Sequence, residues 1–202
     1  MVSTSWTLVT GPTFEPVTVD EAKRQARIVD QHSDDVIASY IRTAREEAES
    51  ALNFGILTQT WRLDLSAWAE RIPLPMAYQL QSITNVKYYD GDGTLQTLST
   101  STYTTDAVSR PAAVVRASNY AWPTLQADRL TGKIQITYVV GWTTAAAVPE
   151  RIKQGMKMFV TYLDADRDGA AIFGNVSLAD KARESAYACW ADRLYWIEPS
   201  CA

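Results

Sequence analysis

The sequence is short of the side chains on which most catalytic and metal centres depend. Its 202 residues include one histidine, His32, and two cysteines, Cys189 and Cys201. That inventory is poor for a histidine-activated nucleophile and excludes a zinc cluster of cysteine and histidine ligands. The chain also contains no P-loop, no Gly-x-Gly-x-x-Gly turn and no nucleophile elbow. We therefore expect no enzymatic activity and no cofactor.

Long apolar runs and an excess of basic residues are also missing. No stretch approaches the roughly 20 apolar residues of a membrane span. The 19 basic and 23 acidic residues leave a net charge of -4, so we expect no broad basic surface for nucleic acid. Residues 1–10 lack the basic start and apolar run of a secretory signal. With two late cysteines and no disulfide framework, we expect reduced thiols and synthesis in the cytoplasm.

The predicted secondary structure changes twice along the chain, which divides it into three segments. Residues 1–55 are predicted to be helical, residues 56–147 to form strands and turns, and residues 148–202 to be helical again. Two helices on their own would leave an apolar face open. We therefore predict an α+β fold with one core of four helices from the N- and C-terminal segments. A small antiparallel β module of five or six strands is inserted between the second and third helices.

Capping residues and turns delimit these elements. Residues 18–21 form a capping box, Gly55 suits a left-handed position after the second helix, and Pro149 and Ser177 open the third and fourth helices. Alternating or β-branched runs predict the strands, with Asp90-Gly-Asp-Gly93 as a hairpin turn. The predicted strands are 58–65, 83–89, 94–98, 113–116 and 133–140.

Acidic residues are concentrated in the first segment, which carries nine acids against five basic residues. One interpretation is a solvated helix face. The other is a surface that repels polyanions and lets nucleic acid pass without binding. The acids of this segment include Asp30, Asp34, Asp35, Glu46, Glu47 and Glu49.

One loop copies the opening of a calcium-binding EF-hand. Asp164, Asp166 and Asp168 take ligand positions 1, 3 and 5, and Gly169 takes the turn position. Position 12 is Asn175 where a bidentate glutamate is needed, so the candidate is weak. A calcium-dependent binding module is the alternative function, and a charged interhelical loop is the structural explanation. A hydrolase with two carboxylates in an aromatic cleft is a third hypothesis.

The fourth helix has an apolar and aromatic surface wider than one packing face requires. The helix is either buried on two sides within its own chain or docks into a partner protein. The residues concerned are Tyr187, Trp190, Arg193, Tyr195 and Trp196.

The order of several short motifs resembles the head–tail connector (adaptor, or head-completion) proteins of tailed bacteriophages and gene transfer particles. The resemblance covers about residues 15–163 and weakens in the last helix. It is carried by the motifs PVTVDEAK at 16–23, RIVD at 27–30, DDVIASYIRTAR at 34–45, NFG at 53–55, LTQTW at 57–61, IPLP at 72–75, SITNV at 82–86, YDGDGT at 89–94, YVVGW at 138–142 and VPERIKQ at 148–154.

The resemblance implies a structural virion protein. About a dozen copies would form a ring beneath the portal protein, extend the DNA channel and dock the next neck or tail component. The aromatic fourth helix would then contact the portal. DNA would pass without specific binding, no membrane would be involved, and the protein would reach the virion neck after assembly in the bacterial cytoplasm. The candidates for channel lining are Asp34, Asp35, Glu46, Glu47 and Glu49.

Overall fold

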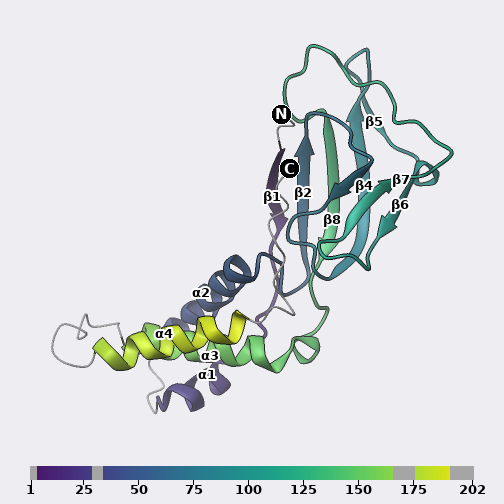
Figure 1. The fold of residues 1–202 in the computed structure, drawn as a ribbon. Helices are drawn as coiled ribbons and strands as arrows, with labels where there is room; N and C mark the ends of the chain where they lie inside the picture. Colours follow the sequence, from purple (N-terminus) through teal and green to yellow (C-terminus); the bar gives the residue numbers. More distant parts are fainter. Residues whose placement is uncertain (1–3, 29–33, 166–175, 192–202) are drawn as a thin grey trace. The chain divides into compact units, whose positions relative to one another are not determined.

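The computed structural model describes residues 4–28, 34–165 and 176–191, which divide into two compact units. The β unit contains residues 4–12 and 58–141, and the helical unit contains the described residues from 13–57 and from 142 onward (Figure 1). The chain passes between the units after Pro12, Leu57 and Gly141. The mixed α+β composition expected from the sequence is confirmed.

Two helices of the helical unit each contact the other three, and one of them makes the more extensive contacts. This helix, α3, packs against α1, α2 and α4. Helices α2 and α3 bury apolar stripes, such as Ile37, Ile41 and Ala44 on α2. The helices are α1 (Val19–Ala26), α2 (Asp34–Leu52), α3 (Glu150–Ala165) and α4 (Val176–Trp190), and a 3-10 turn, η2 (Ala145–Ala147), precedes α3.

No helix within the described ranges is both long and apolar enough to cross a membrane.

The predicted capping box is present at the start of α1. The amide of Glu21 donates to the Thr18 hydroxyl at 3.2 Å, and the Thr18 amide donates to the Glu21 carboxylate at 2.8 Å. The expectation for Gly55 is wrong, because Asn53 takes the left-handed position with φ 56°. Since α2 ends at Leu52, the turn falls on the next residue, and asparagine tolerates that conformation better than most side chains.

The β unit contains two antiparallel sheets. The larger has the strand order β1-β2-β8-β4-β5, and the smaller has the order β3-β7-β6. A 3-10 turn, η1 (Thr100–Thr102), lies between β5 and β6. The strands are β1 (Thr4–Thr10), β2 (Gln59–Leu65), β3 (Arg71–Pro73), β4 (Leu80–Tyr89), β5 (Leu95–Thr97), β6 (Tyr103–Asp106), β7 (Ala113–Arg116) and β8 (Ile134–Val140).

A shared apolar core holds the two sheets face to face. Strand β8 shows the period of two most clearly, with every second side chain buried. Within this core Tyr138 donates its hydroxyl to the Pro75 carbonyl at 2.7 Å, and burial raises the pKa of that phenol. The core includes Leu63, Leu65, Ile72, Leu74, Val86, Val114, Ile134, Ile136, Tyr138 and Val140.

Strand β1 corrects the expectation that the first 55 residues are helical. It pairs with β2 in antiparallel register, with Thr4 opposite Leu65 and Leu8 opposite Trp61. Alternation of Thr and Ser with Trp6 and Leu8 suits a strand, but the partner lies some fifty residues away in the sequence. Strands β3 and β6, three and four residues long, were also not predicted.

Candidate interaction surfaces

The C-terminal half of α4 is anchored on α3 by one large side chain. Trp190 is 2% exposed, and its indole N–H donates to the Ile152 carbonyl at 3.4 Å. Gly155 makes room for the ring, because a Cβ at that position would lie 2.3 Å from Trp190 Nε1. The Phe159 and Tyr187 rings lie 5.9 and 5.3 Å from it, centroid to centroid. Trp190 is therefore a core residue of its own chain.

Tyr187 links α4 to α2 at the edge of this cluster. Its hydroxyl donates to Glu47 Oε2 at 3.0 Å, and the guanidinium of Arg183 lies 5.8 Å from its ring centre. Burial, followed by the hydrogen bond to Glu47, raises the pKa of Tyr187. Of the five aromatic and basic candidates for partner contact, Tyr187 alone is partly exposed among the described residues. Arg193, Tyr195 and Trp196 lie outside those residues.

The acidic candidates on α2 have different environments. Asp34, Asp35 and Glu46 are exposed, whereas Glu47 is half-buried and bonded to Tyr187. Asp34 also forms an ion pair with Lys23 of α1. The fifth candidate, Glu49, is buried. The structure therefore leaves three of the five carboxylates on the surface of the helical unit.

Glu49 belongs to a buried polar network centred on Arg45. Arg45 Nη1 donates to Glu49 Oε2 at 2.8 Å, and Arg45 Nε donates to Glu15 Oε2 at 2.9 Å. The other oxygen of Glu49 accepts the Ile56 amide at 2.8 Å. Burial raises the pKa of Glu15 despite the opposing effect of Arg45. The network joins residues next to two of the chain crossings, so its role is to hold those segments on α2.

The calcium candidate receives no support from the structure. Asp164 lies near the end of α3, while Asp166 and Asp168 lie outside the described residues. Within the described ranges, no three His, Cys, Asp or Glu side chains converge as a metal site would require.

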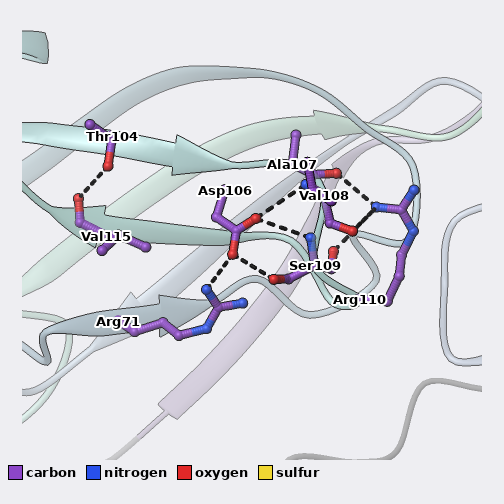
Figure 2. A network of polar contacts seen from close by, with 8 residues as sticks. All are labelled: Arg71, Thr104, Asp106, Ala107, Val108, Ser109, Arg110 and Val115. Atoms are coloured by element: carbon purple, nitrogen blue, oxygen red, sulfur yellow. Dashed lines mark hydrogen bonds and ion pairs between the residues drawn. The ribbon is translucent and has the colours of Figure 1, made fainter.

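Sequence reasoning missed a braced loop between β6 and β7 (Figure 2). The Asp106 carboxylate accepts hydrogen bonds from Arg71, from the Ser109 hydroxyl and from the amides of Val108 and Ser109. These hydrogen bonds hold the pKa of Asp106 well below its usual range, and the bond from the Ser109 hydroxyl has the largest effect. Arg110 donates to the carbonyls of residues 107–109. The tip of this ordered loop is Val108, which is 89% exposed.

The aromatic residues of the β unit tie loops together. Trp68 and Trp122 stack with their ring centroids 4.4 Å apart. Their indole N–H groups donate to the carbonyls of Pro123 and Ala69 respectively. The two indole N–H groups therefore link the segment around Trp68 to the segment around Trp122.

The outer edge of β1 is a second feature that the sequence did not reveal. All seven residues of the strand are exposed, including Trp6, Leu8 and Val9. Among the described strands β1 pairs with β2 alone, so its other edge presents backbone N–H and C=O groups.

Comparison with known proteins gives these surfaces a context. Residues 16–106 match the phage gp6-like head-tail connector protein family. The match includes α1 and α2 of the helical unit and β2 to β6 of the β unit. The resemblance drawn from the sequence motifs is confirmed. A search of curated proteins gave no match.

Three solved structures have a fold similar to that of this chain. A chain from "Neck of empty GTA particle computed with C6 symmetry" is 19% identical with a TM-score of 0.67, covering 89% of this chain and 95% of that one. A chain from "Virion of native gene transfer agent (GTA) particle" is 21% identical with a TM-score of 0.66, covering 88% and 94%.

A chain from "Neck of native GTA particle computed with C12 symmetry" is 19% identical with a TM-score of 0.63, again covering 88% and 94%. The matched family and these chains are structural parts of particles rather than enzymes.

Proposed function

We propose that this chain is a structural protein of a virion neck, in which about a dozen copies form a ring between portal and tail. The observation that carries the proposal is the connector-family match over residues 16–106. The shared fold covers nearly nine-tenths of the chain, and the fold relatives come from neck structures computed with sixfold and twelvefold symmetry. The protein would be assembled in the bacterial cytoplasm as part of the particle.

We also propose that the four helices form one common core that supports the ring. The contacts of α3 with α1, α2 and α4 favour this arrangement. Trp190 then serves to hold α4 in a defined position on α3. Portal contact is assigned to Arg193, Tyr195 and Trp196, with Tyr187 at the margin.

The channel role is assigned to the exposed carboxylates of α2. Asp34, Asp35 and Glu46 would face the lumen and disfavour binding of a polyanion as DNA passes. Glu49 takes no part in this role, because its charge is buried and paired with Arg45. Glu47 is assigned to holding Tyr187.

Docking of the next neck or tail component is assigned to the loop between β6 and β7, whose exposed tip is Val108. An ordered loop loses little conformational entropy on binding, and its apolar tip can enter a pocket on a partner. Replacement of Val108 by Asp should therefore weaken that docking while leaving portal binding intact.

The test is the native mass of the full chain, alone and with its cognate portal protein. We expect a ring-sized species with the portal, and a chain that stays monomeric and ignores the portal would refute the proposal. Truncation after Ala191 keeps the buried Trp190 and removes the assigned portal residues. This variant should stay folded and lose portal binding, and retained binding would refute the assignment of the C-terminal residues.

A further inference from the structure

The edges of the two sheets differ in how they are protected against pairing with another chain. Natural edge strands are commonly blunted by charged side chains, by proline or by being very short. In the smaller sheet, β3 contains Arg71 and Pro73, and β6 ends at Asp106, which is paired with Arg71. Strand β5 of the larger sheet has the protection of being very short, with three residues, but none of them is charged.

Strand β1 lacks these protections along most of its length. It has seven residues with no charge and no proline, and its pairing with β2 is regular from Thr4 to Leu8. Val9 sits in an irregularity that interrupts the register only after Leu8. Trp6 and Leu8 lie on the same face as Leu63 and Trp61, opposite which they pair. The edge therefore combines backbone groups that no described strand pairs with and apolar side chains that continue the inner face of the sheet.

We propose that the β1 edge is the site at which a second copy of this chain adds to the sheet, through β5 of that copy. This inference rests on the proposed ring. A cyclic ring needs two different surfaces on each subunit, and the two ends of one sheet provide them. Neither strand carries a charged side chain, so joining them buries no charge within the paired strands.

The strand directions define how the two edges meet. Neighbours in the larger sheet are all antiparallel, so β1, β8 and β5 run in the same direction. If a ring continues the sheet from one copy to the next, β5 of one copy therefore lies parallel to β1 of the next. Thr7 pairs with Arg62 and Thr97 with Lys87, which places both threonines on the face opposite the core.

Thiol cross-linking tests this contact in the full chain. Thr7→Cys and Thr97→Cys are introduced together into a background with Cys189→Ser and Cys201→Ser, and a short bismaleimide is added under conditions in which the wild type forms the ring. We expect a ladder of covalent oligomers that reaches the full ring mass. Each single cysteine variant should remain a monomer on a denaturing gel.

The outcomes separate the interface from the proposed function. If the wild type forms a ring and the double variant yields no ladder, the β1 contact is refuted and the ring stands. Dimers from Thr7→Cys alone indicate pairing of two β1 strands and likewise overturn the proposal. A wild type that never assembles refutes the proposed function and this interface with it.

A charge at the edge provides a second, independent test. Leu8→Lys should abolish the ring species because the added charge would be desolvated in the joined sheet, while the thermal unfolding of the monomer stays close to that of the wild type. Leu130→Lys is the matched control, since Leu130 is 85% exposed in a loop of the same unit. Equal assembly of the two variants would overturn the proposal.

Discussion

Replacing Gly155 by alanine tests whether α4 is held by the indole of Trp190. On helix propensity alone, alanine stabilises the interior of a helix by about 1 kcal/mol relative to glycine. The structure instead predicts that Gly155→Ala lowers the stability of the protein. The added Cβ would lie 2.3, 2.8 and 2.9 Å from three atoms of the Trp190 ring, and contacts below 3.0 Å force a shift.

The size of this loss in the free energy of unfolding depends on whether the Trp190 indole can move away from the added Cβ. Trp190 is 2% exposed and has Phe159 and Tyr187 against it, so little room is left for rotation. Loss of a buried tryptophan from its site costs about 3 to 5 kcal/mol. After subtraction of the gain in propensity, we expect Gly155→Ala to lower the free energy of unfolding by about 2 to 4 kcal/mol.

Urea denaturation followed by far-ultraviolet circular dichroism measures this change, because the helical signal reports on the unit that contains both residues. The control is the same substitution in a Trp190→Ala background, where the steric conflict is gone. There Gly155→Ala should stabilise by about 1 kcal/mol. Unchanged or higher stability of the single variant would refute the assigned role of Gly155.

Three further predictions follow from the polar contacts. Arg45→Met leaves Glu49 buried without its cation and should cost about 3 to 5 kcal/mol in chemical denaturation, whereas a loss below about 1 kcal/mol would contradict a buried pair. The lowered pKa of Asp106 contributes stability above its unfolded pKa of about 4, and this contribution is lost as the pH falls below that value. Asp106→Asn should therefore flatten the acid-side decline in melting temperature, and parallel curves for variant and wild type would contradict this. Thr18→Ala should cost about 1 kcal/mol of stability through loss of the α1 cap, with Thr18→Ser as a control that retains it.

Elements with a strong local signal could be predicted from the sequence. The capping box at Thr18 and the apolar stripe of α2 are determined by residues close together in the chain. The alternation in β8 is equally local. These patterns located the four helices and the strands β2, β4 and β8, because caps and periodicity act over a few residues.

Elements that depend on distant partners could not be predicted. Strand β1 is stabilised by β2, some fifty residues on, and β3 is too short to show a period. The acids of α2 looked alike in the sequence, yet Glu49 is buried against Arg45 while Glu46 is exposed. Burial of a carboxylate is decided by the segments that fold over it, and here these include Glu15 and the Ile56 amide.

The sequence by itself determined that this chain has one histidine and two cysteines and carries a mild acidic excess. It also showed an order of short motifs that resembles the head–tail connector proteins. Only the tertiary structure decided which aromatic and acidic side chains remain for a partner. The sequence made Trp190 a candidate for partner contact. The structure buries its side chain, because Gly155 of α3 leaves space for the indole ring. The uncharged strand β1 lies at the edge of the larger sheet as formed by the described strands, and an edge exists only once the sheet has formed.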